Sequence, residues 1–302
     1  MKEEEKADGP ASRILFVVNP KSGNGKDYAS LKDLILAHSK ANYFSFDIYE
    51  MRGNDSDRIK SRIKDYQPTI VAAAGGDGTV KMVAEILGGT ELTMAIIPVG
   101  SANGMAKELN IGGRVEPAIE LLTTHQVRAI DLLLINGEIC IHLADMGLNA
   151  RVVKRFESDK KRGILTYAKH LFGEMFLLKH YRFTVNYDGK TRVIKAVSIT
   201  FANASKYGTG AVINPEGKLD DGRFELVLVK PFPNVKLLSI AWKMFLNKLH
   251  TSDYVEILSC TKAHVVCSRK STLQIDGEVI GKVKEIDVSI MKGALKIIVP
   301  RT

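Results

Sequence analysis

The sequence predicts an α/β domain, built on a parallel sheet with helices on both faces, followed by a mainly antiparallel β domain. From residue 12 to residue 130, strand-like and helix-like segments alternate, as they do in parallel sheets. After Ile130, strand-like segments follow one another between turns. A chain of 302 residues with 45 % hydrophobic side chains can bury two such cores. We therefore expect a disordered tail at residues 1–11, then domains at residues 12–130 and 131–302.

The elements of the first domain follow from hydrophobic periodicity. Apolar, β-rich runs predict buried strands at residues 14–18 and 69–74, and further strands at residues 44–49 and 94–98. Apolar residues at helical spacing predict helices at residues 31–38, 59–66, 79–87 and 117–123. Pro68 ends the second helix because proline cannot continue the hydrogen-bond ladder, and Gly88 with Gly89 ends the third. Strands separated by helices in this way run parallel.

The second domain consists mainly of short strand-like runs. They lie at residues 181–187, 193–202, 224–229, 264–267, 271–276, 286–290 and 295–299. Asp188 and Gly189 form a strong hairpin signal after the first of these runs, because both residues tolerate the positive φ angles of a tight turn. Helical insertions are expected at about residues 163–178 and 233–249.

The loop after the third predicted strand carries the strongest signal for chemistry. It reads Gly75, Gly76, Asp77, Gly78 and Thr79, and it opens a predicted helix. Glycines let the backbone approach a phosphate, and a helix N-terminus adds partial positive charge. Asp77 would repel a phosphate, so it indicates either Mg²⁺ beside a bound nucleotide or a hydrogen bond that orders the loop. The alternative is a tight turn in which Asp77 and Thr79 only cap the helix.

Two further loops leave the same predicted sheet, one after the first strand and one after the fourth. Their polar and glycine residues are Asn19, Ser22 and Gly23 in the first, and Ser101 and Asn103 in the second. Because the carboxyl ends of parallel strands meet at one edge, the three loops should form one phosphate pocket. No GxxxxGK[ST] motif and no complete GxGxxG after a strand is present, which excludes a P-loop NTPase and a standard dinucleotide binder.

The composition indicates which class of partner the protein binds and in which compartment it is found. The formal charge of +9 favours an anionic partner, and we expect an acidic membrane surface rather than nucleic acid, with a merely solvated basic face as the alternative. The three cysteines form no CxxC pair, which suits a reducing compartment. The acidic start is unlike a signal peptide, and no apolar stretch approaches the ~20 residues that span a bilayer. We expect a cytoplasmic protein, peripherally associated with the membrane.

The three loops together resemble the nucleotide loops of the diacylglycerol kinase catalytic domain family, which also includes sphingosine kinases. The likeness rests on Asn19, Pro20, Ser22 and Gly23, then on Gly75, Gly76, Asp77, Gly78 and Thr79, then on Pro98, Gly100, Ser101 and Asn103. It continues in Asp220, Asp221 and Gly222, and in Asp276, Gly277 and Glu278. It spans essentially the whole chain in the right order.

The resemblance implies a nucleotide-binding α/β domain followed by a β-sandwich that binds lipid, with ATP and lipid meeting in the cleft between them. It implies ATP and Mg²⁺ as cofactors, Glu278 as the general base and Asp77 near the nucleotide-bound metal. The loop of Asp220 and Asp221 would hold a structural Mg²⁺. Two positions depart from the family pattern: Gly104 replaces a carboxylate, and Lys218 stands where some relatives have an acid.

The sequence therefore predicts phosphoryl transfer from ATP to the hydroxyl of a diacylglycerol-like lipid. An NAD kinase-like enzyme and a catalytically inactive nucleotide-binding module are the alternatives, and a homodimer stays open. Two apolar segments, at residues 170–178 and 242–246, offer a lipid contact. Packing of both segments on the β domain is the favoured interpretation.

Overall fold

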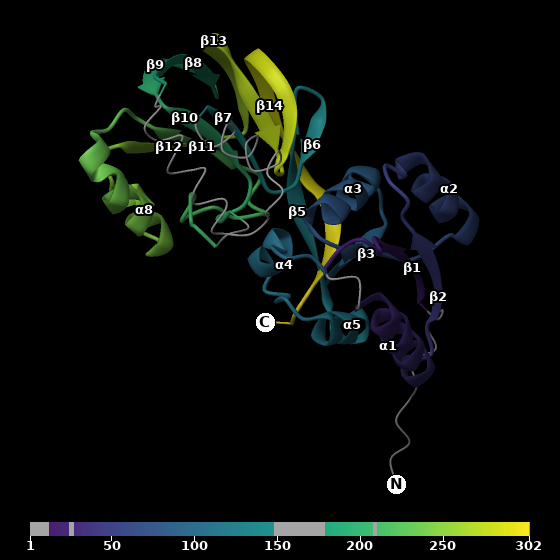
Figure 1. Ribbon diagram of the computed structural model, residues 1–302. Coiled ribbons are helices and arrows are strands. Elements are labelled where there is room, and N and C mark those ends of the chain that lie inside the picture. The colour runs from purple at the N-terminus through teal and green to yellow at the C-terminus, as the bar shows by residue number, and fades with distance from the viewer. Residues whose placement is uncertain (1–11, 24–26, 148–178, 208–209, 302) are drawn as a thin grey trace.

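The computed structural model describes residues 12–23, 27–147, 179–207 and 210–301. Figure 1 shows a helix-flanked region formed by the first part of the chain and a strand-rich region beside it. The predicted tail at residues 1–11 and the predicted helix at residues 163–178 lie outside the described residues. The α/β region followed by a mainly antiparallel β region confirms the predicted fold class.

The helix-flanked region is built on four parallel strands. They are β1 (Arg13–Val18), β2 (Ser45–Glu50), β3 (Ile70–Gly75) and β4 (Thr93–Pro98). Their order in the sheet is β4-β3-β1-β2, and every neighbouring pair is parallel. Every residue of β3 is buried, which agrees with its continuous apolar sequence and its central position. Because the strands are parallel, the loops after β1, β3 and β4 leave the same edge.

Helices cover both faces of this parallel sheet. They are α1 (Asp27–Asn42), α2 (Ser56–Tyr66), α3 (Asp77–Leu87), the short α4 (Gly104–Glu108) and α5 (Val115–Thr124). Figure 1 shows α1 and α5 on one face and α2 and α3 on the other. The predicted helices at residues 59–66, 79–87 and 117–123 are confirmed within three residues at each end.

The strand-rich region extends the same sheet with antiparallel pairs. Its strands are β5 (Gln126–Ile135), β6 (Glu138–Cys140), β7 (Leu143–Gly147), β8 (Tyr181–Tyr187), β9 (Lys190–Ala196), β10 (Ser198–Ala202), β11 (Phe224–Val229), β12 (Val255–Cys260), β13 (Lys262–Ile275) and β14 (Glu278–Val299). The main path is β12-β11-β10-β7-β13-β14, with β8 paired to β13 and β9 paired to β8. The helical insertion expected near residues 233–249 contains η1 (Asn234–Lys236), α8 (Leu237–Phe245) and η2 (Leu249–Thr251).

The last strand joins the two regions. Near its start β14 pairs with β13, and near its end it pairs in parallel with β4, with Lys296 opposite Thr93. Leu295 and Ile297 are therefore fully buried in the core of the α/β region. The sequence indicated two separate strands at residues 286–290 and 295–299. The structure has one strand with a register shift between Met291 and Leu295, so the interruption is a local irregularity and not a turn.

The other strand boundaries show the same kind of difference. The predicted strand at residues 193–202 is divided at Val197, because β9 pairs with β8 whereas β10 pairs with β7 and β11. The runs at residues 264–267 and 271–276 belong to the single strand β13, which has an irregularity between Val266 and Ser271. The hairpin at Asp188 and Gly189 is confirmed, with φ angles of 42° and 78°. The domain boundary between residues 130 and 131 stays a prediction.

Candidate active site

The three predicted phosphate loops lie at one edge of the parallel sheet and are linked through their backbones. The N–H groups of Val99 and Gly100 both donate to the carbonyl of Gly75, at 3.1 and 3.2 Å. The N–H of Asn19 donates to the carbonyl of Ala74 at 3.0 Å. The loops after β1 and β4 are therefore both tied to the end of β3, as expected from the parallel order.

Two glycines in these loops are required by close packing. A Cβ atom on Gly75 would lie 2.3 Å from Oγ1 of Thr79, and one on Gly100 would lie 2.4 Å from the Cα of Gly76. The second contact is between two backbones, so no side-chain rotation can relieve it. The loops after β3 and β4 thus approach each other at a distance that only glycine permits.

We expect Gly100→Ala to lower the free energy of unfolding by about 2–3 kcal/mol, because the added methyl group would push the two loops apart. Gly78→Ala is the matched control in the same region. A Cβ on Gly78 meets nothing within 4 Å, and Gly78 lies in the first turn of α3. Alanine should leave stability unchanged or raise it by up to about 1 kcal/mol there. Urea unfolding of both variants measures the difference, and equal stabilities would contradict the close approach of the loops.

Asp77 connects the glycine-rich turn to the third loop. It is the first residue of α3, and its Oδ1 accepts the N–H of Gly104, the first residue of α4, at 2.7 Å. The sequence offered a hydrogen bond that orders the loop as one of two roles for Asp77. The structure contains such a bond, and it connects Asp77 to the neighbouring loop. Oδ2 of Asp77 has no hydrogen bond to a described residue, so this oxygen is available to a cation.

Two buried polar atoms beside this turn lack a partner among the described residues. They are Oγ1 of Thr79 and Oδ1 of Asn103, both of which the sequence assigned to nucleotide binding. The Nδ2 of Asn103 donates to the carbonyl of Gly100 at 2.7 Å, and its backbone has a φ angle of 52°. A buried polar atom without a partner costs about 1–3 kcal/mol, which a polar ligand would recover. The hydroxyl of Thr79 can donate to a phosphate, whereas Oδ1 of Asn103 only accepts and would take a donor group of a nucleotide or a cation.

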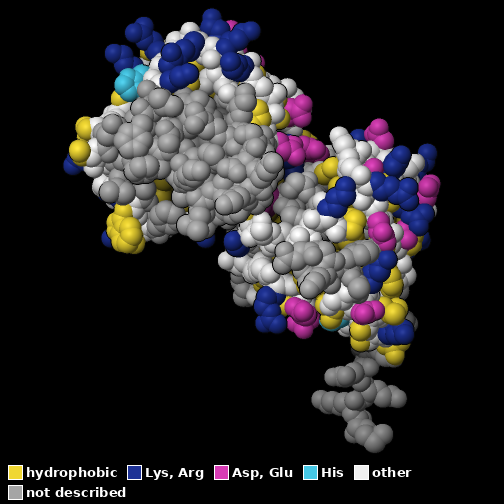
Figure 2. All heavy atoms as spheres, in the orientation of Figure 1, with side chains coloured by type: hydrophobic (Ala, Val, Ile, Leu, Met, Phe, Trp, Pro, Cys, Tyr) yellow, Lys and Arg dark blue, Asp and Glu magenta, His cyan; other side chains and the backbone are white. Residues whose placement is uncertain are grey.

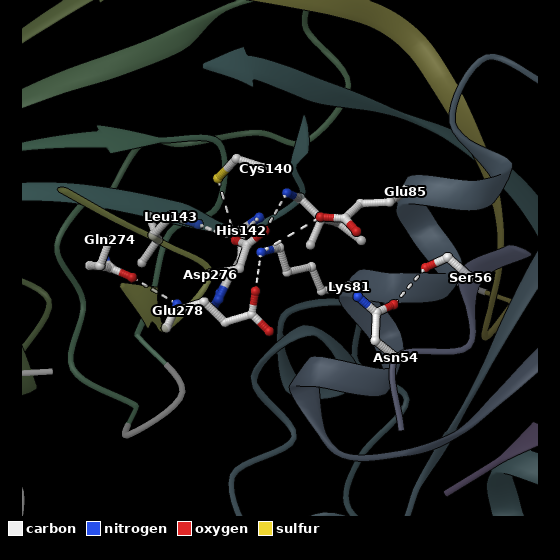
Figure 3. Close-up of polar contacts among 12 residues, drawn as sticks. Asn54, Ser56, Lys81, Glu85, Cys140, His142, Leu143, Gln274, Asp276 and Glu278 are labelled. Carbon is white, nitrogen blue, oxygen red and sulfur yellow. Dashed lines mark hydrogen bonds and ion pairs between the residues drawn. The ribbon is translucent and has the colours of Figure 1, made fainter. Parts of the chain in front are cut away.

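A lysine joins this turn to the strand-rich region. Lys81 lies on α3, one helical turn after Asp77, and its side chain is only 6 % exposed. Its Nζ lies 2.5 Å from Oε2 of Glu278, the first residue of β14, and 3.6 Å from Oε1 of Glu85. Figure 3 shows Lys81 extending between the two carboxylates. Glu278, the predicted base, thus forms an ion pair with a lysine of α3, the helix that begins at the glycine-rich turn.

The pKa values of Lys81 and Glu85 are both raised in the group that they form with Glu278. Burial alone would lower the pKa of Lys81, but the hydrogen bond and charge of Glu278, with Glu85 in addition, raise it above its usual value. Lys81 is therefore positively charged at neutral pH. Burial raises the pKa of Glu85, against the attraction of Lys81. The side chain of Glu278 is 58 % exposed, so its second oxygen is accessible from solvent.

Glu278 is positioned by a tight hairpin between β13 and β14. Asp276 and Gly277 have φ angles of 50° and 88°, as a two-residue type I′ turn requires. The N–H of Gly277 donates to Oε1 of Gln274 at 2.7 Å, and Nε2 of Gln274 donates to the buried Asp145 at 2.5 Å. This hairpin holds Glu278 at Lys81.

The carboxylate of Asp276 points away from Glu278 into the protein. It accepts the backbone N–H groups of Ile141, His142 and Leu143 at 2.9–3.1 Å, and Figure 3 shows these contacts. Burial raises the pKa of Asp276, while the backbone donors oppose that shift. Asp276 therefore anchors the hairpin to the segment that leads into β7.

Comparison with known proteins places this site in a family. The diacylglycerol kinase catalytic domain matches residues 13–135, and the C-terminal NAD kinase beta sandwich-like domain of YegS matches residues 143–299. The chain belongs to the family of proteins that combine a diacylglycerol kinase catalytic domain with the C-terminal domain of YegS. The first match contains all three phosphate loops, and the second contains Glu278.

Individual relatives of this family resemble the chain over most of its length. A diacylglycerol kinase of Mycobacterium tuberculosis is 23 % identical over 300 residues, covering 96 % of both chains. A diacylglycerol kinase of Bacillus subtilis is 25 % identical, covering 88 % of this chain and 89 % of the relative. A crystal structure of a putative diacylglycerol kinase from Bacillus anthracis aligns with a TM-score of 0.78 at 21 % identity, covering 96 % and 97 %. The similarity to this crystal structure shows that the two chains share a fold.

The loop of Asp220 and Asp221 was expected, from the resemblance, to hold a structural Mg²⁺, and one of its two carboxylates is paired with an arginine. Arg128 contacts both carboxylate oxygens of Asp220 at 2.8 Å, and its hydrogen bond lowers the pKa of Asp220. Oδ1 of Asp221 accepts the N–H of Arg223. Among the described residues no group of three His, Cys, Asp or Glu side chains could hold a metal. The guanidinium of Arg128 thus occupies Asp220 but not Asp221, and the assignment of Asp220 and Asp221 as metal ligands stays a prediction.

Sequence reasoning missed the carboxylate that orders this loop. Asp131 is buried, its Oδ2 accepts the N–H of Gly222 and its Oδ1 accepts the N–H of Gly293, both at 2.7 Å. It also missed Lys81 and Gln274. Lys81 had a usable signal, because it is a lone lysine in an apolar helix, four residues after Asp77 and four before Glu85. Asp131 and Gln274 had none, since each lies in a strand-like run with no motif.

Asp276→Asn should lower the free energy of unfolding by about 2–4 kcal/mol, because an amide cannot replace a carboxylate that accepts three backbone N–H groups. Asp188→Asn is a matched control. Asp188 occupies the same position in the hairpin of β8 and β9 and accepts the N–H groups of Thr261 and Lys262, but it is partly exposed. We expect its substitution to cost less than about 1 kcal/mol. Denaturant unfolding measures both, and an equal loss would show that burial does not matter at Asp276.

Proposed function

We propose that this protein is an ATP- and Mg²⁺-dependent lipid kinase that phosphorylates the hydroxyl of a diacylglycerol-like lipid. The observation that carries the proposal is the contact between Lys81 and Glu278. It places a solvent-accessible carboxylate from the β region beside the helix that begins at the glycine-rich turn. A pocket that only bound a nucleotide would not need this carboxylate.

The nucleotide would be held by the three loops at the edge of the parallel sheet. Asn19, Ser22 and Gly23 of the first loop, Gly75, Gly76, Gly78 and Thr79 of the second, and Ser101 and Asn103 of the third are the proposed binding residues. The unpartnered oxygens of Thr79 and Asn103 support this assignment. ATP supplies the phosphoryl group, and Mg²⁺ neutralises its charge. Asp77 would hold the metal through Oδ2, because its Oδ1 is used by Gly104.

Glu278 would act as the general base. Its Oε2 is bound to Lys81, and Oε1 has no hydrogen bond to a described residue, so Oε1 can accept the proton of the lipid hydroxyl. Lys81 fixes the position of Glu278, because Lys81 is buried and cannot move away easily. The ion pair and the hairpin together orient the carboxylate before the lipid arrives.

The lipid substrate requires contact with a membrane, and we propose that this contact is peripheral, at an acidic cytoplasmic surface. The net charge of +9 supports it. No helix in the described ranges is long and apolar enough to cross a bilayer. A homodimer stays a prediction.

Incubation of the purified protein with labelled ATP, Mg²⁺ and a panel of dispersed lipids tests the proposal. Labelled phosphate should move into the organic extract with diacylglycerol or a related lipid. Label that stays in a phosphorylated, water-soluble nucleotide would favour the NAD kinase-like alternative. The match of the second domain to an NAD kinase beta sandwich-like domain is the reason to test this alternative. ATP binding without transfer to any acceptor would indicate a nucleotide-binding module.

A further inference from the structure

The segment around α8 exposes a cluster of large hydrophobic side chains. Eight such side chains are exposed in the described part of the protein, and three of them lie between residues 235 and 246. They are Val235 at 84 % exposure, Trp242 at 66 % and Leu246 at 48 %. Single exposed apolar residues are common, but a concentration of them on one short segment marks an interaction surface.

Val235 lies in η1, Trp242 in α8 and Leu246 at the C-cap of α8, so the three exposed side chains follow one another along this helical segment. Val235 and Trp242 are seven residues apart and Leu246 follows four residues later, which is the spacing of one helical face. The inner side is formed by Ile240 and Met244, which pack against the third hydrophobic core. We call the outer side, defined by Val235, Trp242 and Leu246, the α8 face.

The α8 face corrects one interpretation made from the sequence. Packing on the β domain was favoured for residues 242–246, and it holds for Met244, but Trp242 and Leu246 point outward. Figure 1 places α8 on the flank of the strand-rich region farthest from the α/β region, and Figure 2 shows hydrophobic side chains exposed along that flank.

The segment that carries the α8 face has charges of a single sign. Residues 231–252 contain no Asp or Glu, and they contain Lys236, Lys243 and Lys248. None of these lysines forms an ion pair with a described residue, and Nζ of Lys243 donates only to the carbonyl of Thr251. An apolar stripe bordered by unpaired lysines is complementary to an anionic bilayer surface, whose acyl boundary accepts apolar side chains and whose headgroups attract the lysines.

We propose that the α8 face is a membrane-docking surface, which inserts Trp242, Val235 and Leu246 at the boundary between headgroups and acyl chains of a bilayer that contains anionic lipid. A second copy of the chain is a poorer occupant. A twofold interface would bring the two lysine-rich borders together, with no acid among residues 231–252 to compensate. The proposal rests on the proposed function only in that a lipid kinase must reach a membrane, and docking itself requires no catalysis.

Trp242 makes this proposal directly measurable, because it is the single tryptophan of the chain. Its fluorescence therefore reports on the α8 face alone. The full-length protein is mixed with phosphatidylcholine vesicles, with vesicles that also contain phosphatidylserine, and with matching vesicles whose acyl chains carry bromine. With phosphatidylserine present, the emission should shift to shorter wavelength, and the brominated chains should quench it. Salt should reverse both effects.

Variants test which side chains contribute. Val235→Ser should weaken vesicle binding about tenfold, because it removes an apolar side chain that docking buries. Val193→Ser is the matched control, since Val193 is 62 % exposed on β9 and lies outside the α8 face. It should leave binding unchanged. Replacing Lys236 and Lys248 by Gln should weaken binding roughly fivefold for each lysine, only in vesicles that contain anionic lipid.

The outcomes separate docking from catalysis. Co-sedimentation with anionic vesicles without any change in Trp242 emission would overturn the proposal, because contact would then occur elsewhere on the protein. A blue-shifted emission without vesicles that disappears on dilution would overturn it in favour of a second copy. If insertion is observed but the parent protein phosphorylates no lipid, the docking surface stands and the proposed function fails. If both hold, Val235→Ser should lose turnover on vesicles and keep it on lipid dispersed in detergent micelles.

Discussion

Glu278→Gln should lower lipid kinase turnover by about 10²–10⁴, with little change in ATP affinity. Glutamine keeps the shape of the side chain and can still accept the hydrogen bond from Lys81, but it cannot take a proton from the lipid hydroxyl. Because Glu278 lies at a hairpin tip that is anchored through Asp276 and Gln274, the variant should fold normally. Steady-state kinetics with lipid in detergent micelles measures the effect without interference from membrane docking.

Glu85→Gln provides the matched control for Glu278. Glu85 is the second carboxylate at Lys81, at 3.6 Å, and it lies on the same helix as the lysine. Its substitution removes one negative charge from the same group without touching the proposed base, so turnover should stay within about threefold of the parent. If both variants lose turnover equally, the charge around Lys81 matters and Glu278 has no special role as a base.

Asp77→Asn should reduce turnover by about 10³ while the protein keeps its stability. The asparagine Oδ1 can still accept the N–H of Gly104, so the connection between the loops survives. The negative charge that would hold the nucleotide-bound metal is lost, and positioning supplies most of phosphoryl-transfer catalysis. Turnover should therefore fall much more than the melting temperature, which differential scanning calorimetry can confirm.

Two further variants distinguish the charge of Asp77 from its hydrogen bond. Asp77→Ala removes both and should cost an additional ~1 kcal/mol of stability, the usual value of a lost helix-terminal hydrogen bond. Asp57→Asn removes a carboxylate from the first turn of α2, away from the loops, and should leave turnover unchanged. If Asp77→Asn turns over normally and only Asp77→Ala is slow, then the carboxylate serves the loop structure and does not hold a metal.

The sequence predicted the elements of the α/β region well because their signals are local. The parallel strands β1, β3 and β4 are mainly apolar runs, and α2 and α3 have apolar residues at helical spacing with clear ends. Strand boundaries in the β region were less predictable. The division of residues 193–202 at Val197, and the single strand from Glu278 to Val299, depend on which strands pair, and periodicity does not contain that information.

Only part of the candidate site could likewise be predicted from the sequence. The phosphate loops could be found from sequence because a strand, a glycine-rich turn and a helix follow each other within a few residues, and parallel strands bring such turns to one edge. The base could be named from its resemblance to a family. Its partner could not, because Lys81 and Glu278 are 197 residues apart and meet only when the hairpin of β13 and β14 reaches α3.

By itself, the sequence determined the fold class, the three loops and the net positive charge, all of which follow from residue type and short-range order. The tertiary structure alone decided three matters. It placed Arg128 on Asp220, where a metal was expected, it used Asp131 to tie Gly222 to Gly293, and it left Trp242 facing outward. Each depends on which side chain is nearest in space, and that is set by the packing of distant segments, which hydrophobic periodicity cannot specify.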